Sequence, residues 1–218
     1  GAGPGNSYGL NIKLPMEQSA NPFIENDPHL LEFKYFFTRK LVFIKESSAT
    51  VLLPGGFGTL DEGFENLTLF QTGKCMPRPI ILLDNKKDNY WDRWMDFISS
   101  MLIEQGFAKK SDLSLVYRAR SPQQAIDHIL NYYKVFHSLR YINDLTLLRL
   151  TKQLPPEVVK KLNAEFQDII VEGLLKSTPP HEQELKNKEY LTLPRLSLHF
   201  DRKGYGRLNQ LIAAINQA

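Results

Sequence analysis

The sequence from Val51 to Glu62 reads Val-Leu-Leu-Pro-Gly-Gly-Phe-Gly-Thr-Leu-Asp-Glu and contains the most specific motif of the chain. Its first three residues are apolar, as in a buried strand, and three glycines then follow within four residues. Glycine lets the backbone approach an anion closely. The N–H groups at the start of a following helix, together with the helix dipole, favour negative charge. The stretch therefore predicts a strand, a phosphate-binding loop and a helix N-terminus.

Four residues of this stretch are placed to bind phosphate: Gly55, Gly56, Gly58 and Thr59. In this interpretation their backbone N–H groups and the Thr59 hydroxyl donate hydrogen bonds to phosphate oxygens. The simpler alternative is a tight turn in which Thr59 only caps the helix. We favour phosphate binding because a simple turn does not require three glycines.

Two acidic residues, Asp61 and Glu62, follow the loop. We expect them in the first helical turn, where carboxylates complement the helix dipole. The helix dipole accounts well for one carboxylate in this turn but less well for two. Glu62 shares a helix face with Thr59, so it projects towards whatever the loop binds. Because a carboxylate repels phosphate, Glu62 would act elsewhere on the ligand, either as a base or by stabilising positive charge.

Upstream of the opening stretch, residues 30–45 predict a helix that is apolar on nearly every side and buried against a sheet or a partner. Arg39 and Lys40 interrupt its apolar surface. The helical neighbours of Arg39 are aromatic or aliphatic, so its guanidinium needs an anionic partner, such as a ligand phosphate or Glu62. In the alternative, both cations extend from a buried helix to solvent.

Strands and helices alternate along residues 1–133, which predicts a doubly wound parallel α/β sheet. The strands are expected at residues 9–14, 49–53, 80–84 and 113–117. The helices that follow the loop are expected at residues 59–73, 90–105 and 121–133, the last with Ser121 as N-cap.

The alternation ends after Tyr133, and residues 134–218 predict a small α+β extension. Its expected elements are a hairpin about Asn143 (residues 135–142 and 145–150), a helix at 155–175, a polar loop at 177–188, a strand at 195–200 and a helix at 205–214.

Composition excludes several classes of protein. The 218 residues are 42% hydrophobic and 23% charged, which is typical of a globular chain. A net charge of +3 does not indicate a nucleic-acid partner, and no apolar run is long enough to span a membrane. The single cysteine, Cys75, fits a reducing compartment and is expected to be inert. The scattered histidines predict no metal site. We therefore expect a cytoplasmic protein.

Residues 1–5 read Gly-Ala-Gly-Pro-Gly and form a second glycine-rich sequence, yet no strand precedes it and no helix follows it. We interpret this as residues missing before Gly1 and between Gly5 and Asn6. The alternative is a remnant of cloning.

Arg39-Lys40, followed by Pro-Gly-Gly-Phe-Gly-Thr-Leu-Asp-Glu from Pro54 to Glu62, resembles the LOG (Lonely Guy) family, often labelled "lysine decarboxylase-like". That family carries an Arg-Lys pair on a helix and the pattern Pro-Gly-Gly-x-Gly-Thr-x-x-Glu. The resemblance covers about residues 1–133, and residues 1–5 match an earlier Gly-x-Gly-Pro-Gly loop of the family. The family's first strand and helix, and a helix with a Met-Glu pair after that loop, are absent from the sequence.

The resemblance implies a Rossmann-like nucleotide-binding catalytic domain and a phosphoribohydrolase. Such an enzyme, of the AMP nucleosidase or cytokinin riboside 5′-monophosphate phosphoribohydrolase type, hydrolyses the N-glycosidic bond of a nucleoside 5′-monophosphate to free base and ribose 5-phosphate. It also implies no cofactor and a homodimer or higher homo-oligomer, for which the aromatic helix is a candidate contact. Nothing in the sequence marks a pyridoxal-phosphate lysine, so lysine decarboxylation is a poor interpretation.

Carried over residue by residue, the resemblance implies that Arg39 and Glu62 are the catalytic pair. The substrate-binding residues that it implies are Lys40, Gly55, Gly56, Phe57, Gly58, Thr59 and Thr68. The alternative function is a non-catalytic carrier or sensor of a nucleotide or of molybdenum cofactor, whose carrier proteins have a similar fold and a glycine-rich loop. A carrier needs the loop but not the carboxylate of Glu62.

Overall fold

The structure is a computed structural model that describes residues 7–13 and 20–218. The chain divides into two units, Gly1–Ser47 and Ser48–Ala218, and each is considered by itself. The glycine-rich sequence at residues 1–5, and the break in the chain that we predict after it, lie outside the described residues.

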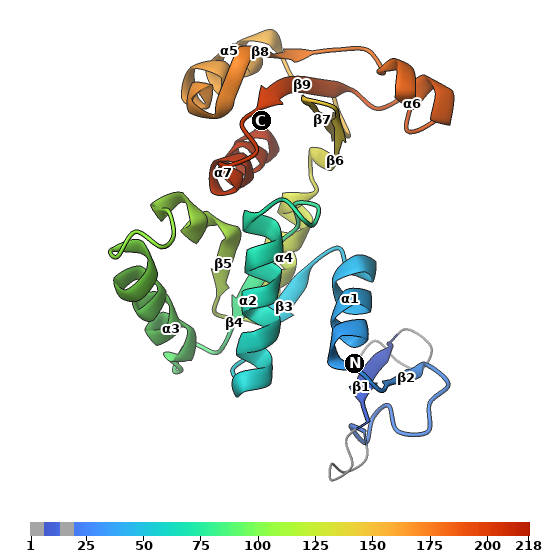
Figure 1. Ribbon diagram of the computed structural model, residues 1–218, viewed down its shortest axis with the longest axis vertical. Helices are drawn as coiled ribbons and strands as arrows, with labels where there is room; N and C mark the ends of the chain where they lie inside the picture. The colour runs from blue at the N-terminus through green and yellow to red at the C-terminus, as the bar shows by residue number, and fades with distance from the viewer. Residues whose placement is uncertain (1–6, 14–19) are drawn as a thin grey trace. The chain divides into compact units, whose positions relative to one another are not determined.

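The first unit contains two short strands and a helix. Strands β1 (Gly9–Ile12) and β2 (Leu30–Phe33) pair in parallel, and helix α1 (Phe36–Glu46) follows them (Figure 1). The helix predicted at residues 30–45 is therefore wrong over Leu30–Phe33, which form β2. Backbone pairing explains the difference, because β1 offers partners to β2 and the N–H of Gly9 donates to the carbonyl of His29 at 3.1 Å.

Helix α1 carries the aromatic side chains that were expected to be buried. None of its residues is buried within the chain, and the side chains of Phe37 and Leu41 are 68% and 63% exposed. The contact of this helix with a partner stays a prediction.

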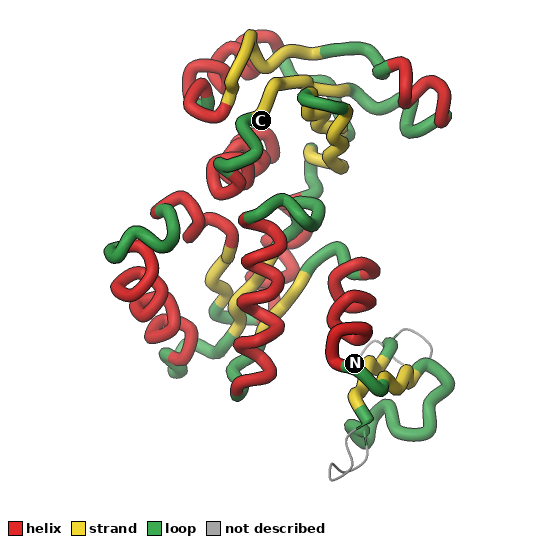
Figure 2. Tube along the Cα trace, in the orientation of Figure 1, coloured by secondary structure: helices red, strands yellow, loops and turns green. Residues whose placement is uncertain are grey.

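The second unit begins with a parallel sheet in the order β3-β4-β5. Its strands are Thr50–Leu52, Ile80–Leu83 and Val116–Ala119. Helices alternate with these strands, as Figure 2 shows, and they are α2 (Phe57–Gln71), α3 (Tyr90–Ile98) and α4 (Pro122–Tyr132). Two further helical segments lie between α3 and β5, a π-helix at Ser99–Ile103 and a 3-10 helix at Lys110–Leu115.

Helices cover both faces of this parallel sheet. Ile80 packs in one cluster with Phe70 of α2 and Trp91 of α3. The next residue of the strand, Ile81, packs instead with Ala125 of α4. Because successive side chains of a strand point to opposite faces, α2 and α3 lie on one face and α4 on the other. The predicted doubly wound, Rossmann-like α/β fold is confirmed.

Two predicted details of this sheet have different outcomes. The strand expected at residues 113–117 begins only at Val116, because the 3-10 helix takes up the residues before it. The Asp112 carboxylate stabilises the start of that 3-10 helix by accepting the N–H of Lys109 at 3.1 Å. Ser121 caps α4 as predicted, since its hydroxyl oxygen accepts the N–H three residues later at 3.3 Å.

The chain after α4 forms an antiparallel sheet in the order β6-β7-β9-β8. Its strands are β6 (Phe136–Ile142), β7 (Leu145–Leu150), β8 (Ile170–Ser177) and β9 (Arg195–Phe200). Its helices are α5 (Pro156–Glu165), a 3-10 turn at Gln167–Ile169, α6 (Glu182–Asn187) and α7 (Tyr205–Asn216). The predicted α+β extension and its hairpin about Asn143, which has a φ of 53°, are confirmed.

The helix predicted at residues 155–175 is wrong beyond Glu165. Strand β8 takes its place and pairs with β9, and Gly173 adopts a left-handed backbone with a φ of 68°. The β-branched residues at the start of this strand favour an extended backbone, and β9 supplies hydrogen-bond partners. The polar loop expected at residues 177–188 also contains α6.

Helix α7 contacts both parts of the second unit, since it packs against the antiparallel sheet and also touches α4. Its residues Leu208, Leu211 and Ile212 are fully buried in the core of the antiparallel sheet. Its Asn209 accepts a hydrogen bond from the hydroxyl of Tyr132 in α4 at 2.9 Å. The domain boundary that we predict after Tyr133 stays a prediction.

Candidate active site

The glycine-rich loop lies at the carboxyl end of β3, and α2 begins two residues earlier than predicted. Gly56 is the N-cap, and the first intrahelical hydrogen bond runs from the N–H of Leu60 to the carbonyl of Gly56 at 3.2 Å. The N–H groups of Phe57, Gly58 and Thr59 therefore precede the first helical acceptor and are oriented along the helix axis. This arrangement suits an anion at the helix end.

Thr59 and the acids after it lie deeper in the helix than expected. Thr59 occupies the first turn of α2, so the alternative in which it is the N-cap is wrong. The expectation that Asp61 and Glu62 lie in the first turn is wrong as well, since that turn contains no acidic residue. The helix dipole therefore accounts less well for the presence of Asp61 and Glu62 than the sequence suggested.

The three glycines of the loop have different surroundings. A Cβ added at Gly55 would lie 2.2 Å from the Thr59 hydroxyl oxygen, so the tight loop itself requires glycine there. A Cβ added at Gly56 or Gly58 would meet no atom within 4 Å. Packing within the described chain therefore does not explain these two glycines, whereas a ligand at the helix end would. Phe57, between them, is 94% exposed.

Glu62 lies one turn beyond the loop. At about 100° of rotation per residue, it is about 60° around the helix from Thr59, on the shared face that the sequence predicted. The side-chain amide of Asn66 donates to the Glu62 backbone carbonyl at 2.8 Å. The Asn66 side chain thus holds the backbone of the helical turn that carries Glu62.

A tyrosine that the sequence did not single out holds the loop from the side of α3. The Tyr90 hydroxyl donates to the Gly55 carbonyl at 2.7 Å. A cavity of about 650 Å³ lies beside this contact. Its lining residues are Pro54, Leu60, Asp88, Asn89, Tyr90, Arg93 and Trp94.

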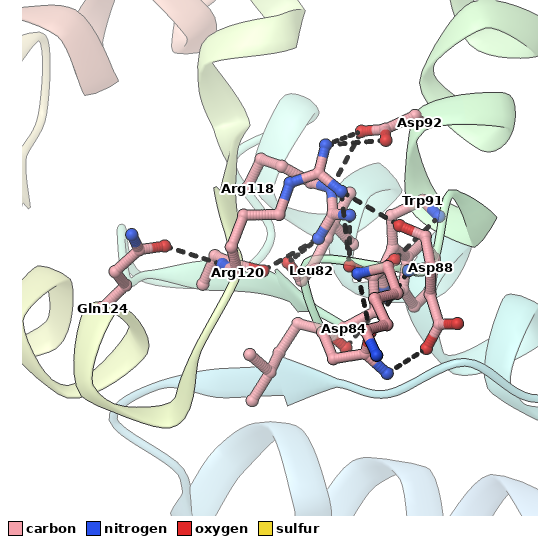
Figure 3. A network of polar contacts seen from close by, with 12 residues as sticks. Leu82, Asp84, Asp88, Trp91, Asp92, Arg118, Arg120 and Gln124 are labelled. Atoms are coloured by element: carbon pink, nitrogen blue, oxygen red, sulfur yellow. Dashed lines mark hydrogen bonds and ion pairs between the residues drawn. The ribbon is translucent and has the colours of Figure 1, made fainter.

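An ion-pair network fixes the start of α3 at the ends of β4 and β5 (Figure 3). Arg118 pairs with the buried carboxylate of Asp84, and Arg120 contacts both Asp92 oxygens, at 2.6 and 2.7 Å. The hydrogen bond from Arg120, together with Arg118, lowers the pKa of Asp92. Because Asp92 lies in the first turn of α3, the network also fixes Tyr90, which precedes it by two residues.

Thr68 lies on another side of α2 from Glu62. The two are separated by about 120° around the helix and about 9 Å along it. Thr68 lines a smaller cavity of about 150 Å³ between α2, α3 and the 3-10 helix, together with side chains such as Phe64 and Trp94. Its predicted role in substrate binding stays a prediction.

Arg39 and Lys40 lie on α1, in the first unit, as the sequence predicted for a helical pair. The Arg39 guanidinium lies 5.5 Å from the centroid of the Phe36 ring, a distance typical of a cation–π contact. The pairing of Arg39 with Glu62, which belongs to the second unit, stays a prediction.

Other candidate chemistry is limited in the described part of the chain. Residues 7–13 and 20–218 contain no group of three or more His, Cys, Asp or Glu side chains arranged to hold a metal ion. Burial raises the pKa of the Cys75 thiol, although Arg78 acts in the opposite direction, and a raised pKa disfavours the reactive thiolate. Among the described helices, none has both the length and the apolar character needed to cross a membrane.

Comparison with known proteins matches one family model and several relatives. A family model described as "Possible lysine decarboxylase" matches residues 3–129, more than half of the chain. A protein of Oryza sativa subsp. japonica named probable cytokinin riboside 5′-monophosphate phosphoribohydrolase is 33% identical over 94 residues, which are 43% of each chain. An Arabidopsis thaliana protein named cytokinin riboside 5′-monophosphate phosphoribohydrolase is 31% identical over 94 residues, 43% of this chain and 42% of its own. The matched segment thus spans less than half the length of these relatives.

Proposed function

The chain belongs to the LOG family, and from that premise we propose that it is a phosphoribohydrolase of nucleoside 5′-monophosphates. The reaction would hydrolyse the N-glycosidic bond and release the free base and ribose 5-phosphate. One structural observation carries the proposal, namely that Glu62 lies on the same side of α2 as Thr59, one turn beyond a helix end suited to an anion. The names of the plant relatives support the same reaction class.

The loop would bind the 5′-phosphate. The first N–H groups of α2 supply donors, and the open space at Gly56 and Gly58 leaves room for phosphate oxygens. Binding the phosphate fixes the ribose in front of the catalytic groups, so that binding energy remote from the reacting bond contributes to catalysis. The Tyr90 contact would keep the Gly55 carbonyl turned away from the phosphate.

Glu62 would act at C1′. Departure of the base gives C1′ oxocarbenium character, as in glycoside hydrolysis, and a carboxylate stabilises that charge. Glu62 would also accept a proton from the attacking water, whose oxygen forms the new bond to C1′ while the bonding electrons leave with the base nitrogen. Arg39 would orient the substrate and Glu62, and Lys40 would add a second cation near the phosphate.

The preferred base, the assembly and the location belong to the same proposal. AMP and cytokinin nucleotides are the candidate substrates. The exposed aromatic residues of α1 support a homodimer or a higher homo-oligomer. We propose a cytoplasmic enzyme that needs no cofactor.

A substrate panel tests the proposed activity. The protein is incubated with AMP, other nucleoside 5′-monophosphates and cytokinin riboside 5′-monophosphates, and free base and ribose 5-phosphate are quantified. Matched nucleosides without the 5′-phosphate serve as controls and are expected to react at least about a hundredfold more slowly, because the loop contributes nothing to their binding. Binding of nucleotides without release of base from any of them would instead support a carrier or sensor.

A further inference from the structure

A buried amide, Asn66, connects the Glu62 turn to the sheet. Its residue is 4% exposed, and both ends of its side-chain amide are used. The Nδ2 group donates to the Glu62 carbonyl at 2.8 Å. The Oδ1 atom accepts from the Thr50 hydroxyl at 3.1 Å and from the Arg78 guanidinium at 2.5 Å. One side chain therefore joins α2, β3 and the segment just before β4.

Arg78 makes this junction a charged one. Its residue is only 5% exposed, and burial lowers the pKa of its guanidinium. A buried cation is costly unless it is hydrogen-bonded. Its contact with Oδ1 polarises the Asn66 amide, and hydrogen bonds in such chains strengthen one another. The donation to the Glu62 carbonyl is strengthened as a result.

The geometry of this junction bears on Glu62 itself. Contacts from Thr50 of β3 and from Arg78 meet at one atom of α2, so they tie this point of the helix to the sheet. Glu62 projects from the turn held by the third contact. A displacement of about 1 Å in a catalytic group costs as much as about a hundredfold in rate.

We propose that Asn66 and Arg78 are positioning residues that set the place of the Glu62 carboxylate relative to C1′ of the substrate. This inference rests on the proposed phosphoribohydrolase function. Neither residue touches the substrate in this account, so their effect falls on the chemical step and not on phosphate binding.

The first test replaces the donor of Asn66 and keeps its shape. Asn66→Asp keeps two acceptors for Thr50 and Arg78 but removes the donation to the Glu62 carbonyl. We expect kcat to fall at least about tenfold while KM stays within about twofold of wild type. An unchanged kcat, or a raised KM at constant kcat, would overturn the proposal.

A matched control exists on α5. Asn163 also donates to a carbonyl four residues earlier, that of Val159 at 3.0 Å, and it joins α5 to Leu175 of β8 at 2.7 and 2.8 Å. Asn163→Asp removes the same kind of contact far from the loop in sequence. We expect it to lower the urea midpoint of unfolding without changing kcat. An equal loss of kcat in both variants would mark a general effect of stability and contradict the proposal.

Arg78 is tested by charge rescue. Arg78→Met removes the guanidinium and is expected to lower kcat about tenfold. Arg78→Lys keeps one charged donor for the Asn66 oxygen and is expected to return kcat to within about threefold of wild type. Equal losses in the two variants would contradict the positioning role.

A readout independent of turnover separates this inference from the proposed function. Amide hydrogen exchange at residues 61–66 is expected to be faster in Asn66→Asp than in wild type, whether or not the protein releases a base. Absence of base release by wild type would overturn the proposed function alone. Unchanged exchange in the variant would overturn the positioning role.

Discussion

Gly55 and Gly58 occupy one loop for different physical reasons. A side chain at Gly55 would collide with Thr59, whereas a Cβ at Gly58 would meet no atom within 4 Å. The first glycine shapes the loop, and the second leaves space that we propose the phosphate of the substrate occupies. The sequence showed that glycines gather here, but their separate roles depend on atoms that only the folded loop brings together.

Gly58→Ala separates stability from binding. The residue lies within α2, where alanine favours the helix over glycine by up to about 1 kcal/mol. We expect an equal or higher free energy of unfolding and a KM for the nucleotide that rises at least about tenfold, because the new methyl group occupies the phosphate space. Urea denaturation and steady-state kinetics measure the two effects. An unchanged KM would contradict the assigned ligand position.

Tyr90→Phe tests the support of the loop. It removes one hydrogen bond to the Gly55 carbonyl, which contributes about 0.5–1.5 kcal/mol. We expect a several-fold higher KM with a smaller change in kcat. The control is Tyr133→Phe, which also removes a donation to a backbone carbonyl, that of Ser48 at 2.6 Å, and is expected to leave KM unchanged. Equal KM values in wild type and Tyr90→Phe would refute the role.

The residues that sequence reasoning missed have partners far along the chain. Tyr90 contacts a loop 35 residues earlier, and Asn66 contacts residues 16 earlier and 12 later. No local pattern of residue types encodes such pairs. The glycines, Glu62 and the Arg39-Lys40 pair could be singled out from the sequence because each group lies close together within one loop or helix, and their role in a site stays a prediction.

At the scale of elements, segments with a distinct local signal were predicted better than segments without one. The strand β4 is a continuous apolar run, and the helix α4 has a cap and a proline at its start, so both could be recognised. The residues of β2 and most of those of β8 were predicted as parts of longer helices, because periodicity alone does not separate a strand from a neighbouring helix. Their state is decided by partners, β1 for β2 and β9 for β8, that local periodicity does not reveal.

A buried ion-pair cluster holds α6 to the antiparallel sheet. The Glu184 carboxylate, which is fully buried, lies 2.7 Å from Arg149 of β7 and 2.9 Å from Arg195 of β9. Burial alone would raise the pKa of Glu184, but the backbone N–H of His181 and the two guanidiniums lower it further than burial raises it.

Glu184→Gln tests this cluster. We expect a loss of about 3 kcal/mol in the free energy of unfolding at neutral pH, because the buried Arg195 loses its anion and Arg149 keeps only Glu189. A carboxyl whose pKa is lowered by folding stabilises the protein above its ordinary pKa, and this contribution is lost as pH falls through the lowered value. The variant should therefore lose less stability than wild type on acidification. Parallel curves of stability against pH would contradict the assignment.

At the scale of the whole molecule, α7 makes the extension part of the second unit. The side chain of Asn216 accepts from the N–H groups of Val135 and Phe136 at 2.8 and 2.9 Å and donates to the Tyr132 carbonyl at 2.6 Å. These contacts hold the connection between α4 and β6. The sequence predicted the extension and its closing helix, but it did not predict that the helix also contacts α4.

Phe37→Asp tests the proposed assembly. Phe37 is 68% exposed on α1, so a charged side chain there costs the folded monomer little but disfavours burial against a second copy. We expect sedimentation to show an oligomer for wild type and a monomer for the variant. Leu130→Asp, on the exposed side of α4, serves as the control and should leave the mass unchanged. A wild-type monomer would contradict the proposed oligomer.

Glu62 is the residue that we propose makes the glycine-rich loop the active site of an N-glycosidase. The most direct test of this proposal compares single-turnover release of base by wild type, Glu62→Gln and Asp61→Asn, with ribose 5-phosphate binding measured by calorimetry on the same samples. We expect Glu62→Gln to lower the rate at least about a thousandfold while binding is retained, and Asp61→Asn to stay within about threefold of wild type. Release of base by Glu62→Gln at the wild-type rate would contradict the proposal.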